Sequence, residues 1–167
     1  LEFDFEGDFM GQPANVSNTH YPISTTDWYP RHGYLDRSTY EFVFLHPKNL
    51  KMACVGMRTS EEIIKEEKEI GVTKYKMDYP VALVTFALAD FERHNETIKW
   101  ENGKASIPLE FNSMPGAYRA IKEDFILAEL NNSVRYFQDI FGDYPYNKYG
   151  ATFHPFGFGQ GFPSMLM

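Results

Sequence analysis

The sequence predicts a mainly β chain with one long helix, an α+β fold that begins with a β-sandwich portion. Between residues 38 and 111, six or seven short segments of alternating or continuous apolar residues are separated by Pro, Gly and Asn turn signals. Residues 113–141 instead carry apolar residues three and four positions apart, which is the period of a helix. The 167 residues are 43% hydrophobic and 17% aromatic, so the chain is long and apolar enough to bury a core.

The predicted sandwich strands follow an irregular stretch, residues 6–26, which is rich in Gly, Asn, Ser, Thr and Pro. In residues 38–46, the alternation of Tyr40, Phe42 and Phe44 with other side chains predicts a strand with one buried face. A turn then leads to a short inner strand at 51–56, in which Cys54 is predicted to be a core thiol. Further strands are predicted at 81–91, 97–100 and 106–111, with a hairpin turn at Asn102-Gly103 between the last two.

Residues 59–69 (TSEEIIKEEKE) have two interpretations. Thr59 and Glu62 have the spacing of a helical capping box, and Glu and Lys favour helices. The few apolar residues form a poor helical stripe, however, and Gly71 is placed where a hairpin would turn towards residues 72–77. The hairpin is favoured, and its acidic residues would then form a solvated face.

The long helix is predicted between Ser113, a possible N-cap, and Gly142, which follows its last residue. Pro115 would lie in the first turn, and the length would be roughly 35–40 Å. The apolar stripe consists of Ile121, Phe125, Ile126, Leu127, Leu130, Val134, Phe137 and Phe141. A turn at 143–146 then leads to a strand at 148–153.

Charge and motifs exclude several classes of function. The formal net charge is -7 without a basic cluster, which argues against nucleic-acid partners. The longest apolar stretch, residues 79–91, is too short for a membrane helix, so no membrane segment is predicted. A single cysteine excludes an internal disulfide, and the five histidines lack metal-ligand spacing. Motifs for phosphate loops, dinucleotides and serine nucleophiles are absent.

The segment at 157–163 (GFGQGFP) has three glycines within five positions. Glycine allows positive φ angles and close approach of another backbone. The segment is therefore either a structural bend between strands or a strand edge whose free N–H and C=O groups pair with an extended peptide. The residues alone do not separate these two interpretations.

The order of the elements resembles a known family. A β-domain ending in YPVALVTFALADFE, a long helix, then Phe-Gly-Asp-Tyr-Pro-Tyr at 141–146, a strand and a Gly-rich loop ending in Phe162-Pro163-Ser164-Met165 resemble the alanyl aminopeptidase family of zinc metallopeptidases, the gluzincins related to thermolysin. The resemblance covers residues 28–167. It implies that residues 1–104 are the C-terminal part of a β-sandwich domain and that residues 105–167 begin a thermolysin-like catalytic domain.

The resemblance also implies a function. In the family, the zinc helix with its His-Glu-x-x-His motif follows the Gly-rich loop, so this chain is expected to be a fragment of a zinc peptidase that is inactive alone. Zinc is expected in the full-length parent and not in this fragment, and the parent's partner would be a peptide substrate. The expected substrate-binding residues are Gly159, Gln160, Gly161, Phe162, Pro163 and Ser164.

One departure from the family concerns specificity. Gln160 and Gly161 stand where the family has methionine and the glutamate that binds the substrate's α-amine. Exopeptidase specificity is therefore in doubt, because an ammonium group would lose its charged partner.

Three further expectations remain open. The alternative function is a β-sandwich module that binds carbohydrate or protein through Trp28, Tyr29 and Trp100. An uncovered apolar stripe on the helix would cause self-association. The resemblance is compatible with a periplasmic or membrane-associated parent, but the residues do not fix the localisation.

Overall fold

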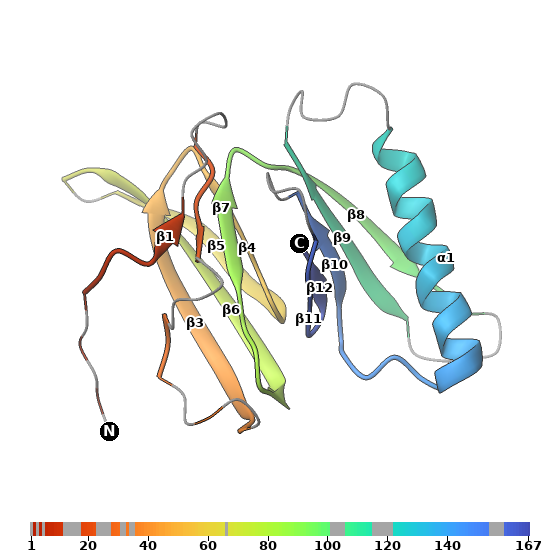
Figure 1. The fold of residues 1–167 in the computed structure, drawn as a ribbon. Coiled ribbons are helices and arrows are strands. Elements are labelled where there is room, and N and C mark those ends of the chain that lie inside the picture. The colour runs from red at the N-terminus through yellow and green to blue at the C-terminus, as the bar shows by residue number, and fades with distance from the viewer. Residues whose placement is uncertain are drawn as a thin grey trace.

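The protein is represented by a computed structural model, which describes residues 2, 4, 6–11, 18–22, 28–30, 33, 36–65, 67–100, 106–114, 122–153 and 159–167. Figure 1 shows a sandwich of strands, a second sheet whose strands include the C-terminal end, and a helix on the far side of that sheet. The predicted α+β class, mainly β with one helix, is confirmed.

The sandwich consists of a three-stranded and a two-stranded antiparallel sheet. The larger sheet has the order β3 (Ser38–Pro47), β6 (Glu69–Val81), β5 (Met57–Lys65), and the smaller one pairs β4 (Lys51–Cys54) with β7 (Phe86–Ala89). Two short strands, β1 (Met10–Gly11) and β2 (Tyr21–Pro22), pair within the stretch predicted to be irregular. A bridge between His20 and Leu88 attaches this pair to β7.

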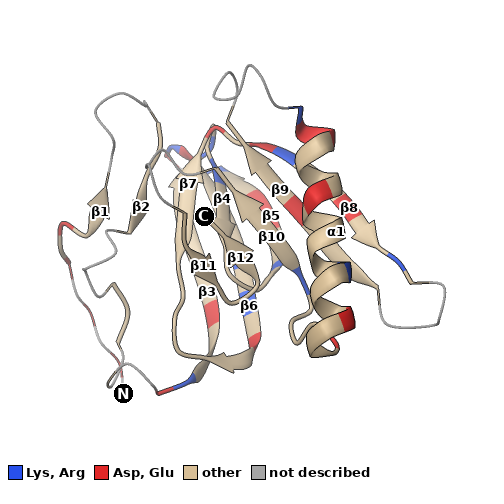
Figure 2. Ribbon diagram, turned by 45° about the vertical axis from the view of Figure 1, so that its right-hand side comes forward, with Lys and Arg blue, Asp and Glu red and all other residues tan. Residues whose placement is uncertain are grey.

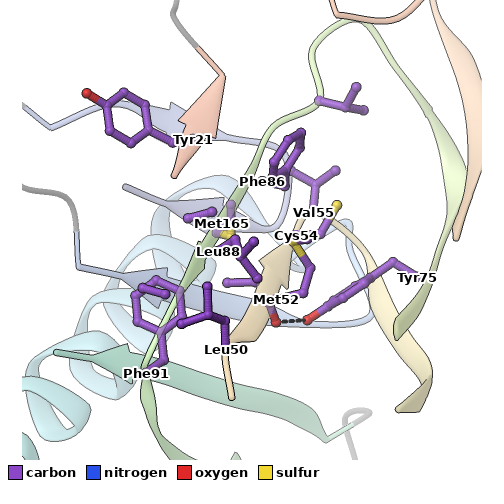
Figure 3. Close-up of a cluster of buried hydrophobic side chains, with 14 of the residues drawn as sticks. Tyr21, Leu50, Met52, Cys54, Val55, Tyr75, Phe86, Leu88, Phe91 and Met165 are labelled. Atoms are coloured by element: carbon purple, nitrogen blue, oxygen red, sulfur yellow. Dashed lines mark hydrogen bonds between the residues drawn. The ribbon is translucent and has the colours of Figure 1, made fainter. Parts of the chain in front are cut away.

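The sandwich core lies between these two sheets and is rich in aromatic residues. The alternation in β3 turns Phe42 and Phe44 inward, and the Phe44 ring lies 5.1 Å from the ring of Phe86 on β7. Tyr75 of β6 reaches across the core, where its hydroxyl donates a 2.7 Å hydrogen bond to the Met52 carbonyl (Figure 3). Cys54 is fully buried in the same cluster, as predicted for a core thiol.

The second sheet has five strands in the order β11, β12, β10, β9, β8. Its members are β8 (Glu92–Ile98), β9 (Ile107–Ser113), β10 (Tyr149–Thr152), β11 (Gly161–Phe162) and β12 (Met165–Leu166). Strand β10 is parallel to both β9 and β12, whereas the outer pairs are antiparallel. The domain boundary predicted at residue 104 falls in the segment 101–105, outside the described residues, and the strands on its two sides, β8 and β9, pair with each other.

Strand β9 shows how the second sheet joins the two other layers. Leu109 and Phe111 pack with Leu130 and Val134 of helix α1 (Glu123–Phe141). Because side chains alternate along a strand, Glu110 and Asn112 point to the opposite face, towards the sandwich. The sheet therefore has one apolar face under the helix and one polar buried face against the sandwich.

Helix α1 is shorter than predicted. Its 19 residues span about 28 Å at 1.5 Å per residue. Ser113 does not cap it, because this residue is the buried end of β9 and pairs with Glu92. Pro115 and Ile121 lie outside the described residues. The C-terminal prediction is confirmed, since Gly142 has a positive φ of 90° and its N–H donates to the Gln138 carbonyl.

Only part of the predicted stripe is covered. Leu130 and Val134 are buried, while Ile126 and Leu127 are partly buried against the sheet. Exposed apolar side chains remain along the helix at Phe125, Tyr136, Phe137, Ile140 and Phe141.

Several strand predictions need correction. The hairpin interpretation of residues 59–69 is confirmed by the β5–β6 pair, but Gly71 lies inside β6 opposite His46 and not at the turn. The strand predicted at 81–91 is shorter, because β6 continues to Val81 and β7 begins only at Phe86. The strand predicted at 97–100 is the end of β8. The predicted Asn102-Gly103 turn lies outside the described residues.

No helix in the described part of the chain has the length and apolar character needed to cross a membrane. Basic and acidic positions are scattered over the described strands and helix (Figure 2).

Candidate functional site

The β11–β12 hairpin forms one edge of the second sheet. In the described residues β11 has a neighbour on one side only, which is β12. Gln160 and Met167 exchange two backbone hydrogen bonds of 2.7 and 2.9 Å, so they form a hydrogen-bonded antiparallel pair. In antiparallel pairing the next residue directs its N–H and C=O to the other side. Gly161, which is opposite Leu166, therefore turns these two groups away from β12.

The six predicted substrate-binding residues differ in exposure. Gly159, Gln160 and Gly161 are exposed, and Phe162 and Pro163 are half-buried. A Cβ atom on Gly161 would meet only the Leu166 Cδ2 atom, at an ordinary contact distance of 3.7 Å. The stretch 159–167 contains no charged side chain (Figure 2). Among the described residues, the edge is thus a neutral strip of backbone with no strand paired on its outer side.

Ser164 lies on the other side of the hairpin, where it is only 2% exposed. Its φ of 67° places it in the left-handed region, at the second position of the Pro163-Ser164 turn. The hydroxyl oxygen accepts a 2.8 Å hydrogen bond from the Gly56 N–H of the sandwich. The Ser164 carbonyl accepts a 2.9 Å hydrogen bond from the Gly150 N–H of β10. Ser164 therefore contacts the interior of the protein and not the open edge.

A buried charged cluster lies close to this turn, between the second sheet and the sandwich. The Lys148 ammonium is 3.9 Å from the Glu110 carboxylate and donates a 3.0 Å hydrogen bond to the Cys54 carbonyl. Arg58 lies 3.3 Å from the other oxygen of Glu110. Lys148 and Glu110 are 4% and 6% exposed, so water screens their charges little.

The cluster continues along the sandwich surface. Glu61 accepts hydrogen bonds from both Arg58 and Arg93, and Arg93 also donates to the Met52 carbonyl. On the other side, the Asn112 amide donates to Glu110 at 3.1 Å and to Thr152 at 3.3 Å. This series of polar contacts thus connects β4 and β5 of the sandwich with β9 and β10 of the second sheet.

Burial and charge shift the pKa values in this region. Desolvation lowers the pKa of Lys148, although the nearby Glu110 carboxylate acts in the opposite direction. Burial tends to raise the pKa of Glu61, but the hydrogen bond and charge of Arg93, with the charge of Arg58, lower it overall. Desolvation raises the pKa of the Cys54 thiol, which keeps it protonated and poorly nucleophilic.

The described residues do not supply a metal site. No group of three His, Cys, Asp or Glu side chains is close enough among them to hold an ion. His154 falls in the segment 154–158, outside the described residues. The charged cluster is also unsuitable, because its two arginines and its lysine already neutralise the carboxylates of Glu61 and Glu110.

A groove lies at the opposite edge of the second sheet. It is an open groove of about 370 Å³ between α1 and β8, lined by polar residues that include Glu96, Asp124 and Arg135. Arg135 is held there by Asn131 and by the Lys99 carbonyl. Because β8 and β11 are the two outermost strands, this groove is separated from the Gly-rich edge by the width of the sheet.

The aromatic residues considered for a binding module are largely engaged within the protein. The Trp28 ring packs against Tyr29, Phe42 and Phe86. Arg135 lies 5.3 Å above the Trp100 ring. These contacts leave less ring surface for stacking on a sugar.

Comparison with known proteins gives a result at the level of the fold. No family model matches the sequence, and no curated protein matches it. Solved structures do match this chain. An M1 zinc metallopeptidase from Deinococcus radiodurans superimposes with a TM-score of 0.74 at 17% identity, over 90% of this chain and 36% of that one.

Two related structures give similar values. A mutant two-domain M1 zinc metallopeptidase bound to L-arginine has a TM-score of 0.73 at 17% identity, covering 96% of this chain and 39% of that one. A mutant from Deinococcus radiodurans bound to a Tyr-Ser-Ala substrate has a TM-score of 0.70 at 17% identity, covering 89% and 35%. This chain therefore spans little more than a third of the length of these proteins and shares their fold.

Sequence reasoning missed the buried charged cluster. Glu110 follows Leu109 and precedes Phe111, so the alternation places it opposite the apolar face, which ordinarily indicates a solvated side chain. Lys148 follows a turn and was expected only to begin a strand. The available signal was the small Gly150 two residues later, since a glycine within a strand often marks a close approach of another backbone.

Proposed function

We propose that this chain is part of a zinc-dependent metallopeptidase that hydrolyses peptide bonds, and that the edge formed by residues 159–162 lines its substrate-binding cleft. The observation that supports this most strongly is the shared fold with M1 zinc metallopeptidases over about nine-tenths of the chain, at TM-scores of 0.70 to 0.74. One of these solved structures holds a Tyr-Ser-Ala substrate.

The geometry of the edge suits an extended peptide. The outward N–H and C=O of Gly161 offer one donor and one acceptor in the plane of the sheet. A peptide that adds as a further strand would pair its backbone with these groups, which gives affinity without reading the side chains. A Cβ atom on Gly161 would meet only the Leu166 side chain, and side chains stand out of the plane of the sheet, so the peptide backbone can reach the Gly161 N–H and C=O within that plane.

Zinc and the groups that activate water belong, in this proposal, to parts of the protein other than the described residues, which do not form a metal site. The contribution of this chain is limited to binding and orienting the substrate. Its edge would hold the peptide backbone in a fixed direction, and the sandwich would hold the edge.

The neutral edge leads to a proposal about specificity. The resemblance predicts a carboxylate at position 161 for binding a free α-amine, and this chain has glycine there. The nearest charged cluster is occupied by its own ion pairs. We therefore propose that the free amine of a substrate contributes little to its binding and that peptides with a blocked N-terminus are accepted nearly as well.

The experiment uses the protein encoded by the complete open reading frame. Stoichiometric zinc measured by mass spectrometry, together with hydrolysis of peptides that chelators abolish, is the expected result. Acetylated and free forms of one peptide should have kcat/KM values within about 10-fold, since no charged partner is lost. A complete protein without zinc or without peptide hydrolysis would refute the proposed function.

A matched pair of variants tests the edge itself. Gly161→Pro removes the outward N–H, whereas Gly161→Ala keeps it and adds a methyl group in ordinary contact distance of Leu166. We expect the proline variant to raise KM by about 5- to 10-fold, the effect of one hydrogen bond, and the alanine variant to change it less than 2-fold or so. Equal effects of the two substitutions would contradict backbone pairing at this position.

A further inference from the structure

Two hydrogen bonds fasten the second sheet to one short turn of the sandwich, and one of them comes from the Gly-rich hairpin. This turn includes Cys54, the last residue of β4, and Val55 and Gly56, which connect β4 to β5. Its Cys54 carbonyl accepts from Lys148, which lies just before β10, and its Gly56 N–H donates to the Ser164 hydroxyl in the β11–β12 turn. These bonds thereby hold together pairs of residues that are 94 and 108 positions apart in the sequence.

The identity of residue 164 is unexpected for its backbone conformation. A turn with Pro at its first central position and a positive φ at the second usually has glycine there. Serine at a φ of 67° is strained relative to glycine, yet its hydroxyl is used in a buried 2.8 Å hydrogen bond. An observed outlier of this kind points to a role for the side chain that offsets the strain.

The partner of this bond is itself fixed. Gly56 has a φ of 80°, and a Cβ atom there would lie 2.4 Å from the Lys76 carbonyl oxygen. Strand β6 therefore sets the position of the Gly56 N–H. Ser164 receives its hydrogen bond from a rigid point of the sandwich and not from a movable loop.

The strands of the hairpin are short, and among the described residues their pairing with the rest of the sheet is limited. Strands β11 and β12 have two residues each, and β12 joins β10 through only two residue pairs, Gly150 with Met165 and Ala151 with Leu166. An isolated two-stranded hairpin is only marginally stable. Met165 is buried in the sandwich core and Phe162 and Met167 pack against it, so apolar contacts hold the strands, while the hydrogen bonds at Ser164 fix the turn between them.

We propose that Ser164 is a positioning residue that sets the orientation of the edge at residues 159–162 by anchoring its turn to the sandwich at Gly56. This inference rests on the proposed function insofar as the edge binds substrate, but the anchoring can be tested separately. It assigns Ser164 a buried supporting role in place of direct substrate contact, while Gly161 remains the residue that meets the peptide.

Amide hydrogen exchange on the full chain tests the anchoring. Ser164→Ala removes the hydroxyl and keeps the strained φ, whereas Ser164→Gly removes the hydroxyl and relieves the strain. Both variants should accelerate exchange by about 5- to 10-fold, the effect of one lost hydrogen bond, at Gly56 and at the hydrogen-bonded amides of Gly150, Gln160 and Met167. Exchange in β3 and β6 should stay unchanged.

A control and two contrary outcomes complete the design. Ser133→Ala, which removes an exposed hydroxyl bonded to the Glu129 carbonyl within α1, should leave exchange in the hairpin unaltered. No acceleration in the hairpin, or equal acceleration throughout the sandwich, would overturn the anchoring role. If Ser164→Ala does not fold, Ser164→Gly supplies the result, because its backbone suits the turn better than serine does.

Kinetics separate this proposal from the function it rests on. In the active complete protein, Ser164→Gly should raise KM for peptides by about 5-fold, with kcat within about 2-fold, because orientation of the bound strand is affected before chemistry. Local acceleration of exchange in a protein that hydrolyses no peptide would retain the anchoring and reject the proposed function. An unchanged KM despite accelerated exchange would reject the link between Ser164 and substrate.

Discussion

Replacing Lys148 with methionine tests whether the buried charged cluster joins the sandwich to the second sheet. Methionine has nearly the volume of the lysine stem but carries no charge and donates no hydrogen bond. The substitution leaves the Cys54 carbonyl without its donor and removes the cation 3.9 Å from Glu110. It retains Arg58 at 3.3 Å and the Asn112 amide at 3.1 Å as partners of that carboxylate.

The expected cost follows from these contacts. A buried carbonyl that loses its donor costs about 1–3 kcal/mol, and two charges at this separation attract by about 4 kcal/mol at an effective dielectric constant near 20. Methionine also removes the desolvation penalty of the buried Lys148 ammonium, and this gain offsets part of both costs. We expect Lys148→Met to lower the free energy of unfolding by about 3 kcal/mol, which corresponds to about 6–12 °C in Tm for a chain of this size.

A double-mutant cycle isolates the ion pair. Glu110→Gln alone should cost a similar amount, because it leaves the Lys148 ammonium buried without its carboxylate. The double variant should be more stable than the sum of the single effects predicts, by about 2 kcal/mol, measured by urea denaturation. Lys48→Met is the matched control, since Lys48 pairs with Glu69 at the surface and should cost less than about 1 kcal/mol. Additive effects, or equal costs for Lys148→Met and Lys48→Met, would refute the reasoning.

Two further predictions concern acid stability and self-association. Since Arg93 and Arg58 lower the pKa of Glu61, this carboxylate stabilises the fold above its unfolded pKa of about 4.3 and loses that contribution as the pH falls through the lowered value. Tm should fall less between pH 5 and pH 3, about the range of that titration, in Glu61→Gln than in the wild type. Equal falls in the two proteins would contradict a stabilising role of the Glu61 carboxylate. The exposed rings of Phe137 and Phe141, 54% and 79% accessible, should make the 167-residue chain self-associate with rising concentration, as measured by light scattering. Replacing Phe137 and Phe141 with serine should abolish self-association. A wild-type chain that stays monomeric at all concentrations would contradict the prediction.

The strands of the sandwich were predictable because their patterns are local. In β3 the aromatic residues recur at every second position, and one face of the strand is in fact turned into the core. The β5–β6 hairpin was identified by the poor helical stripe of its acidic segment. Its turn was misplaced at Gly71, because that glycine serves a close approach to the His46 ring, 2.5 Å from a would-be Cβ, and not a change of direction.

The start of the helix was not predictable from capping signals. Ser113 and Pro115 have the composition of a helix N-terminus, but Ser113 is held in β9 by its pairing with Glu92. The described helix begins after Lys122, which has an extended backbone and makes no side-chain capping bond. Acidic residues in the first turn, Glu123 and Asp124, favour the positive end of the helix dipole instead. Tertiary pairing thus outweighed the local signal.

The Gly-rich edge and the residues that support it differ in how far they can be predicted from the sequence. Three glycines in a short segment indicate where a backbone can be approached, and this part of the site is readable in the sequence. The support depends on residues that come together only in the fold: Ser164, Gly56, Lys148 and Glu110 derive from four separate segments. Period-2 alternation places Glu110 correctly on the non-helix face, but it cannot say that the sandwich covers that face.

The chemistry of this junction explains why it is polar. Two apolar faces pressed together bury area almost equally well in several neighbouring registers, whereas each hydrogen bond has one donor, one acceptor and a narrow range of distance. Lys148 meets the Cys54 carbonyl and Ser164 meets the Gly56 N–H, so both ends of one three-residue turn specify the same docking position. A buried ion pair is a weak source of stability but a good determinant of register. In the proposed peptide-binding role the edge presents the Gly161 backbone in one direction, and these directional contacts would fix the hairpin in the docking position that this orientation needs.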